Sequence, residues 1–390
     1  MNSARAGSPG ASNGPGGAPH VMRIYTRLEV GGIEQQLLRT LPRLAARGRY
    51  RVSLCLLRSE GALAEPLRDT GVPVHVLPAR GRLHPALMLG LRRLFLSESV
   101  RIVHAHTYGA NTSATVAARL TGVPAVIGSI HNMDTIVKPR RLLQERCVAR
   151  MRDLTLAVSE RVRRNYMEAT GLPASRTGVL YNGIDTAPYD GLPRDPAAAF
   201  REFGIAPGRP VVICVARLVE FKRHEGLLAA ARTVVDQRPE ALFLFVGDGP
   251  CEQHLRAETA RLGLSGNVVF AGLRMDTPAL LRASTVSVLA SRKEGFSNVV
   301  IESLAAGVPM VATDVGGNSE AVEDGISGFI VPPGDDAALA AGILSLLNDP
   351  VLLARMQAAA RARAETFSLD SIVLRTEAIY DRLLGREGGG

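Results

Sequence analysis

Residues 290–309 read Ala-Ser-Arg-Lys-Glu-Gly-Phe-Ser-Asn-Val-Val-Ile-Glu-Ser-Leu-Ala-Ala-Gly-Val-Pro. This pattern predicts a strand end, a loop, and a helix that Gly307 and Pro309 terminate. Ser297 or Asn298 can cap the start of the helix. A helix N-terminus carries unpaired backbone N–H groups and partial positive charge, so we expect this one to hold a phosphate group or a developing anion.

Two carboxylates flank the expected helix start. Glu294 lies just before the helix and Glu302 about one turn inside it, so both can face one ligand. A carboxylate accepts two hydrogen bonds from a diol, which suits sugar hydroxyls. Gly295 lets the backbone approach a ligand closely because it has no side chain. On spacing alone, two surface glutamates on a capped helix remain the more common explanation.

Short apolar runs alternate with helical patterns on both sides of this segment. The expected strands are 21–26, 52–57, 74–77, 102–105, 125–130, 154–158, 211–216, 242–246, 268–270, 286–289, 310–312 and 329–331. This alternation predicts an α/β fold with doubly wound, Rossmann-like parallel sheets. Two such sheets side by side face each other across a cleft, and ligands bind at the carboxyl ends of their strands.

The chain divides where this alternation breaks, at a segment rich in proline and glycine, 183–209. We expect a disordered tail over 1–19, an N-terminal Rossmann-like domain over 20–190, and a C-terminal Rossmann-like domain over 191–367. A last helix, 368–385, closes the chain.

Charge is unevenly distributed between the two halves. Residues 1–190 carry 26 Lys and Arg against 13 Asp and Glu, whereas residues 191–390 carry 20 against 24. The basic half favours an anionic partner such as a membrane surface or a lipid phosphate, although an arginine-rich coding bias explains it equally well. Nucleic acid is not expected as a partner, because the aromatic residues are sparse and no recognisable nucleic-acid module is present.

The cysteines and the apolar runs indicate the compartment. The four cysteines have neither C-x-x-C spacing nor a metal-ligand pattern, which predicts reduced thiols without disulfides. There is no apolar run long enough to span a bilayer and no signal-peptide pattern at the N-terminus. We therefore expect a cytoplasmic protein.

The segment 290–309 resembles the signature of the family-4 retaining glycosyltransferases, in which a Glu, seven residues and a second Glu mark the donor site. Further matches follow in the family's order and extend the resemblance over about residues 20–385. These are Gly31-Gly32-Ile33-Glu34, Val103-His104-Ala105-His106, His131, Ala157-Val158-Ser159, Asn182-Gly183-Ile184-Asp185, Ala216-Arg217-Leu218 with Lys222, Gly247-Asp248-Gly249-Pro250, and Asp314-Val315-Gly316-Gly317. The resemblance implies the two-domain GT-B fold, with the last helix folded back onto the first domain. It also implies that the N-terminal domain, 20–190, binds the acceptor and that the C-terminal domain, 191–367, binds the nucleotide sugar.

The resemblance also implies roles on the C-terminal side of the cleft. Arg217 and Lys222 would neutralise the donor diphosphate. Glu302 would bind the ribose hydroxyls and Glu294 the transferred sugar. Backbone N–H groups of Phe296 and Ser297, beside Gly295, would lie near the sugar and phosphate.

Other roles fall to the N-terminal domain. Gly31 and Gly32 would touch the diphosphate through their N–H groups, and Glu34 is expected to cap its own helix. His131 would contact the sugar near the reacting carbon. His104 and His106 are expected to be structural.

The expected reaction is transfer of a sugar from a nucleoside diphosphate donor, weakly favoured as a UDP-sugar, to a hydroxyl of a glycan or lipid-linked acceptor. No Asp-x-Asp motif is present, so neither a metal nor a cofactor is expected. Retention of configuration follows from the resemblance alone. A nucleotide-sugar epimerase and a non-catalytic nucleotide-sugar sensor remain as alternatives.

A basic segment of the N-terminal half suggests peripheral contact with the inner face of the cytoplasmic membrane. If it forms an amphipathic helix, it would place basic and apolar side chains on an anionic leaflet. The side chains concerned are Arg140, Arg141, Arg146, Arg150 and Arg152 with Leu142, Leu143, Val148 and Met151. A solvated helix face explains the same pattern.

Overall fold

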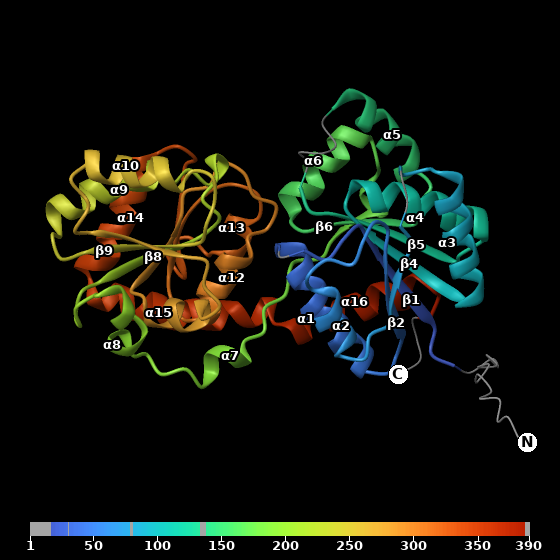
Figure 1. Ribbon diagram of the computed structural model, residues 1–390, viewed down its shortest axis with the longest axis horizontal. Coiled ribbons are helices and arrows are strands. Elements are labelled where there is room, and N and C mark those ends of the chain that lie inside the picture. The colour runs from blue at the N-terminus through green and yellow to red at the C-terminus, as the bar shows by residue number, and fades with distance from the viewer. Residues whose placement is uncertain (1–16, 30, 79–80, 133–137, 387–390) are drawn as a thin grey trace, which may run out of the picture.

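The computed structural model describes residues 17–29, 31–78, 81–132 and 138–386. The expected tail, 1–19, lies outside the described residues except for 17–19. Two lobes of alternating strands and helices stand side by side, and the chain passes from the first to the second along the bottom of the view, through α7 (Ala187–Asp190) and α8 (Pro196–Ala199) (Figure 1). The predicted fold class, two doubly wound α/β domains, is confirmed.

The first lobe is built on a seven-stranded sheet of order β3-β2-β1-β4-β5-β6-β7, in which the paired strands are parallel. Its strands are β1 (His20–Tyr25), β2 (Arg51–Leu56), β3 (Val74–Val76), β4 (Val100–His106), β5 (Ala125–Ile130), β6 (Leu154–Ala157) and β7 (Thr177–Val179). Its helices are α1 (Gly32–Ala46), α2 (Ala64–Arg68), α3 (Pro85–Ser97), α4 (Tyr108–Thr121), α5 (Pro139–Ala149) and α6 (Glu160–Thr170). Strand β7 was not predicted, because its three residues include a glycine and give no periodic pattern.

The second lobe has a six-stranded parallel sheet of order β10-β9-β8-β11-β12-β13. Its strands are β8 (Val211–Val215), β9 (Leu242–Val246), β10 (Val268–Gly272), β11 (Val286–Leu289), β12 (Met310–Thr313) and β13 (Gly328–Val331). Its helices are α9 (His224–Gln237), α10 (Glu252–Arg261), α11 (Thr277–Ala283), α12 (Asn298–Ala305), α13 (Asn318–Ala321), α14 (Asp336–Asn348) and α15 (Pro350–Ala364).

The connection expected to lack regular structure contains two short helices, α7 (Ala187–Asp190) and α8 (Pro196–Ala199). Prolines occupy their first turns, where a missing N–H is harmless. The chain crosses back between the lobes just before α16 (Leu369–Leu383), which packs against α1. The two crossings are hydrogen-bonded to each other, since Ile184 N–H donates to the Phe367 carbonyl and Leu369 N–H to the Ile184 carbonyl.

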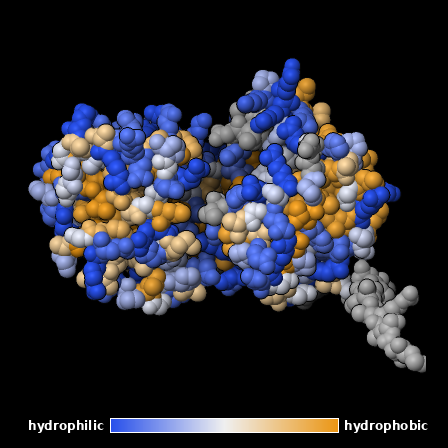
Figure 2. All heavy atoms as spheres, in the orientation of Figure 1, coloured by the Kyte–Doolittle hydropathy of each residue, from blue (hydrophilic) through white to orange (hydrophobic). Residues whose placement is uncertain are grey.

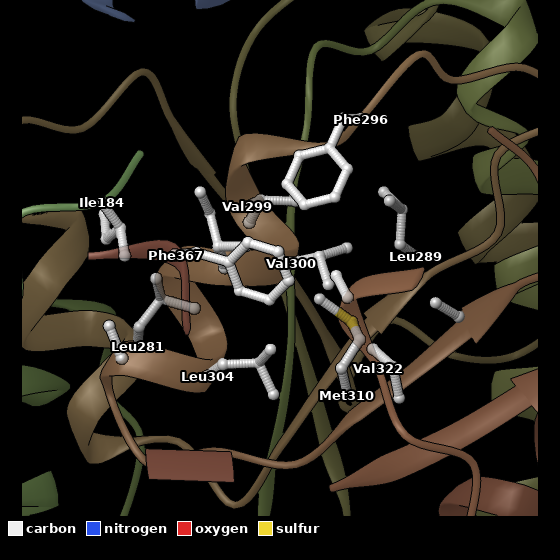
Figure 3. Packing of buried hydrophobic residues seen from close by; sticks show 14 of the residues in the cluster. Ile184, Leu281, Leu289, Phe296, Val299, Val300, Leu304, Met310, Val322 and Phe367 are labelled. Atoms are coloured by element: carbon white, nitrogen blue, oxygen red, sulfur yellow. The ribbon is translucent and has the colours of Figure 1, made fainter. Parts of the chain in front are cut away.

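One apolar cluster extends across both lobes. Figure 3 shows Phe296 above Val300 of α12, with Phe367 beside Val300 and Leu304 below both. The Phe296 ring lies 5.3 Å from that of Phe367 and 5.1 Å from that of Tyr181, measured between centroids. Burial of these rings makes the loop before α12 part of the interdomain core rather than a surface loop.

Candidate functional site

A cavity of about 540 Å³ opens between the two lobes, where Figure 2 shows a hollow. Strand ends and helix starts from both domains line it. Nine of the ten sequence-predicted site residues are among the lining residues: Gly31, Gly32, His131, Lys222, Glu294, Gly295, Phe296, Ser297 and Glu302.

Arg217 is the predicted residue that the structure does not bring to this cavity. It follows β8, its side chain is exposed, and it is not among the lining residues. Its carbonyl accepts a hydrogen bond from Val219 N–H, which fixes a turn that leads to Lys222. Of the predicted cationic pair, Lys222 therefore carries the charge in the cavity wall.

The α12 helix starts at the cavity, as its sequence predicted. Ser297 occupies the N-cap position with extended backbone angles, but its side chain makes no capping hydrogen bond. The expectation that Ser297 or Asn298 caps the helix through its side chain is therefore wrong. Because the first amides of a helix have no partner within it, the start of α12 retains donors for an anion.

The two glutamates at this helix accept hydrogen bonds from different partners. Lys222 Nζ donates to Glu294 Oε1 over 2.5 Å, and the Ser291 hydroxyl donates to the same oxygen over 2.7 Å. Glu302 Oε1 accepts from Arg39 of α1 over 3.3 Å, so its partner comes from the other domain. Both carboxylates are mostly buried, which strengthens their polar interactions relative to water.

Gly295 lies in close contact with the backbone of the other domain. A Cβ atom built on it would stand 1.8 Å from the His131 carbonyl oxygen, and real Cβ contacts stay beyond 3.0 Å. The Gly295 carbonyl accepts a hydrogen bond from Ser159, again across the cleft. The absence of a side chain is thus needed for the observed domain arrangement.

Asn298 joins three chain segments and was considered in the sequence only as a possible cap. Its side-chain nitrogen donates to the Gly32 carbonyl over 3.1 Å, and its oxygen accepts from Asn182 over 2.8 Å and from Gln36 over 3.3 Å. These contacts tie the start of α12 to the first turn of α1. No sequence pattern links Asn298 to its partners, because each of them is more than 100 positions away from it in the chain.

Glu34 behaves differently from the prediction. Its Oε1 accepts a hydrogen bond from the Tyr25 hydroxyl over 2.8 Å, and both residues line the cavity. Burial, and then the Glu34 charge, raise the pKa of Tyr25 well above its usual range. Glu34 thus ties the first turn of α1 to the end of β1, where the sequence predicted a capping role.

A buried chain of hydrogen bonds links Arg23 through His106 to His131, which lines the cavity. Arg23 Nη1 lies 2.8 Å from His106 Nε2, and His106 Nδ1 lies 3.2 Å from His131 Nε2. Since a guanidinium only donates, His106 Nε2 must accept, so its N–H is on Nδ1 and points to His131. His131 Nε2 is then an acceptor as well, and its own proton is on Nδ1. This relay, which the sequence did not reveal, fixes the tautomer of His131.

Burial, and then the Arg23 charge, lower the pKa of His131 to about 4 and hold the pKa of His106 well below its usual range. His104, which contacts Ser129 and Tyr380, has a pKa lowered in the same way. All three imidazoles are therefore neutral at neutral pH.

These depressed pKa values predict a loss of stability in mild acid. Between pH 6.5 and about 4 the histidines bind protons in the unfolded chain but stay neutral in the folded one. The free energy of unfolding therefore falls as the pH is lowered. His131 alone accounts for a loss of about 1–2 kcal/mol by pH 5. Urea unfolding midpoints at pH 7.5, 6.0 and 5.0 measure this loss. A midpoint that stays constant over this range would contradict the assignment.

Replacing Arg23 by Met is expected to separate stability from activity. Arg23 is 4% exposed, and its described contacts are with His106 and Tyr380 rather than with a carboxylate, so loss of its charge should leave the melting temperature unchanged or higher. If His131 contacts the transferred sugar, as the family resemblance implies, sugar transfer should fall about tenfold, because His131 loses its fixed tautomer. The acid limb of the pH–rate profile should move to higher pH, since loss of the cation raises the pKa of His131. An unmoved limb would show that Arg23 only packs the core.

The proposed amphipathic basic segment needs correction at two points. Helix α5 ends at Ala149, so Arg150 and Met151 follow it rather than extend it. Arg152 is 1% exposed and donates to the buried Glu145 carboxylate over 2.7 Å and to Tyr166 over 3.2 Å. Because a buried ion pair stabilises the interior only when both partners stay in place, Arg152 is a core residue and is not available to a membrane.

Among the described residues, no group of three or more His, Cys, Asp or Glu could hold a metal ion, and all four cysteines are free thiols. Within the same residues, no single helix is long and apolar enough to cross a membrane. One pair of consecutive helices, Asp336–Asn348 and Pro350–Phe367, is together long and apolar enough for a membrane span. The two helices are, however, bent by 103° where they meet.

Two protein-family models match this chain, one on each lobe. Residues 30–188 match the family model "Glycosyltransferase Family 4", and residues 196–363 match "Glycosyl transferases group 1". The D-inositol 3-phosphate glycosyltransferase of Acidothermus cellulolyticus is 29% identical over 393 residues, covering 94% of this chain and 85% of its own. The 2-deoxystreptamine glucosyltransferase of Streptomyces kanamyceticus is 27% identical, covering 76% of this chain and 80% of its own.

Among solved structures, Anabaena HepE in complex with UDP superimposes with a TM-score of 0.81 at 25% identity, covering 93% of this chain and 100% of its own. The two family models together span both lobes and meet at the interdomain connection. The chain therefore belongs to the family-4 type glycosyltransferases of GT-B fold, which transfer sugars from nucleotide sugars.

Proposed function

We propose that the protein is a retaining glycosyltransferase that moves a hexosyl group from a UDP-sugar to a hydroxyl of a glycan or lipid-linked acceptor. The pathway would be the synthesis of a cell-surface polysaccharide or glycoconjugate. One observation carries the proposal: Lys222, Glu294, Glu302 and the uncapped start of α12 line a single cavity. HepE, whose structure contains UDP, shares this fold, which favours a uridine donor.

The proposed roles follow from charge and position. The start of α12 and Lys222 stabilise the negative charge that builds on the departing diphosphate. Glu302 accepts hydrogen bonds from the ribose and Glu294 from the transferred sugar, while His131 donates its Nδ1 proton to the sugar. Arg217 lies outside the cavity wall, so we expect it to stabilise the diphosphate charge less than Lys222 does.

In the proposed step, the bond between the anomeric carbon and the diphosphate oxygen breaks as the acceptor oxygen bonds to the same face of that carbon. The acceptor proton passes to the leaving phosphate oxygen. Lys222 and the start of α12 supply the charge stabilisation that a divalent ion gives elsewhere, so the proposed reaction is metal-independent.

A panel of nucleotide sugars tests the donor first, because a ligand that binds the folded state raises its melting temperature. The stabilising donor is then incubated with and without glycan acceptors, and the products are analysed for anomeric configuration. A product with retained configuration supports the proposal. Inverted product would overturn the retaining mechanism, an altered sugar without acceptor would indicate an epimerase, and binding without any turnover would indicate a sensor.

We further propose peripheral membrane contact through the exposed part of the α5 segment, now without Arg152. Arg140, Leu143, Arg146 and Arg150 are exposed there. Co-sedimentation with vesicles should increase with the fraction of phosphatidylglycerol, and the triple change of these arginines to Gln should abolish the increase. Equal sedimentation of both proteins would refute membrane contact and leave the sugar-transfer proposal untouched.

A further inference from the structure

A small cavity of about 50 Å³ adjoins the interdomain cavity inside the N-terminal domain. Strands β1, β4, β5 and β6 contribute to one side of its wall, and helices α1 and α16 contribute to the other. His131 and Asn182 line both cavities. The small cavity has room for a monatomic ion and a water molecule, because one water occupies roughly 10–15 Å³ of such a space.

Arg23 on β1 places a buried positive charge in the wall of this cavity. Arg23 is 4% exposed, and none of the described residues that line the cavity is acidic. Its described partners are His106, 2.8 Å from Nη1, and Tyr380, whose ring centroid lies 5.8 Å from the guanidinium carbon. Both partners are neutral at neutral pH, because burial lowers the pKa of His106 and raises the pKa of Tyr380 to about 12. A guanidinium keeps its proton even when buried, so the charge of Arg23 favours a counter-ion.

Two buried hydrogen-bond donors in the wall have no acceptor within the described part of the chain. Arg23 Nε is the first. The second follows from a series of bonds, in which Arg23 donates to the Tyr380 hydroxyl and this hydroxyl directs its own proton to His104 Nδ1, 2.9 Å away. His104 Nε2 then carries a proton and donates to Ser129 Oγ over 2.8 Å, which leaves the Ser129 proton unused. A buried donor without an acceptor is unfavourable, so both donors favour an anion between them.

The apolar part of the wall indicates which kind of anion fits. Six aliphatic side chains line the cavity: Ile33, Leu37, Leu156, Val158, Leu180 and Ile372. Such a wall cannot replace the hydration shell of an ion, and the cost of removing that shell rises with the charge of the ion. One guanidinium also balances one negative charge. A monovalent, weakly hydrated anion such as chloride therefore matches the cavity better than phosphate or sulfate does.

We infer that the small cavity is a binding site for a monovalent anion such as chloride, which acts as the counter-ion of Arg23. The ion accepts hydrogen bonds from Arg23 Nε and from the Ser129 hydroxyl. It holds the guanidinium in the position from which Nη1 donates to His106, so it supports the relay that ends at His131. The inference is independent of which sugar the protein transfers and of the acceptor that receives it.

Sodium chloride is the first probe, compared with sodium gluconate at equal ionic strength in thermal unfolding of the full chain. A ligand that binds only the folded state raises its melting temperature, and the gluconate ion is too large for the cavity. Chloride is therefore expected to raise the melting temperature of the unchanged protein in a saturable way, and Arg23→Met should abolish that rise. Arg101→Gln removes an exposed charge from β4 of the same sheet and should keep it. Equal melting temperatures of the unchanged protein in the two salts would overturn the inference and leave the cavity to water.

Lys222→Met distinguishes the small cavity from the interdomain cavity, whose proposed diphosphate site also attracts anions. This variant should keep the chloride response, and Arg23→Met should keep the stabilisation by UDP. The opposite result, a chloride response lost in Lys222→Met and kept in Arg23→Met, would place the ion in the interdomain cavity and refute the inference. If UDP failed to stabilise even the unchanged protein, the donor proposal would fall, while the chloride comparison between the variants still decides this one.

Ser129→Ala provides a second variant in case Arg23→Met does not fold. It removes one of the two donors without adding volume, so the chloride concentration for half-saturation should rise several-fold. Its melting temperature in gluconate is expected to fall, because His104 loses its acceptor, but the readout is the response to added chloride. Line broadening in chlorine NMR measures the exchange of chloride with the protein directly. An unchanged half-saturation in Ser129→Ala, or broadening that Arg23→Met leaves intact, would contradict the site.

Discussion

Lys222→Met is expected to lower kcat for sugar transfer by about 10²–10³-fold, because the variant loses the cation that the structure places in the cavity wall. The effect has two physical sources. Charge on the departing diphosphate is no longer stabilised, and Glu294 keeps Ser291 as its hydrogen-bond donor but loses its charged partner. Steady-state kinetics with the donor identified by thermal shift measures the change.

Arg261→Gln is the matched control for Lys222→Met. Arg261 pairs with Glu258 on the exposed face of α10 in the same domain, far less buried than Lys222, and its loss should leave kcat within a factor of about two. Transfer by Lys222→Met within about threefold of the unchanged protein would remove the central cation from the proposed mechanism.

Gly295→Ala should abolish transfer almost completely while each domain stays folded. The added methyl group would stand 1.8 Å from the His131 carbonyl oxygen, a backbone atom that no side-chain rotation can move away. The lobes must then separate, which pulls His131 away from Glu294 and opens the cavity to water. We expect a loss of at least about 10²-fold in kcat, since misplacement of about 1 Å already costs this much.

Gly266→Ala tests whether the loss comes from the domain contact. Gly266 lies in the loop before β10, and a Cβ atom built on it meets nothing within 4 Å. Its activity should equal that of the unchanged protein. Small-angle scattering should show a more open Gly295→Ala molecule, and an unchanged scattering profile with full activity would refute the role of this contact.

The sequence by itself determined the two parallel sheets, because short, buried, largely apolar strands between amphipathic helices have few other stable arrangements. It also indicated most of the residues that gather at the interdomain cavity. Glu294 and Glu302 are joined by one short loop and helix, so their proximity is a local property of the chain. The sequence did not predict the short elements β7, α7 and α8, because segments of three or four residues are too brief to show a hydrophobic period.

Tertiary structure alone decided how each predicted side chain is used. Arg152 looked like a surface charge and is buried against Glu145, while Arg23 looked like part of a strand and fixes the tautomer of His131. Glu302 is met by Arg39 from the opposite domain. The physical reason is that periodicity encodes which face of an element is buried, whereas hydrogen bonds between different elements depend on how those elements pack and how the two lobes dock.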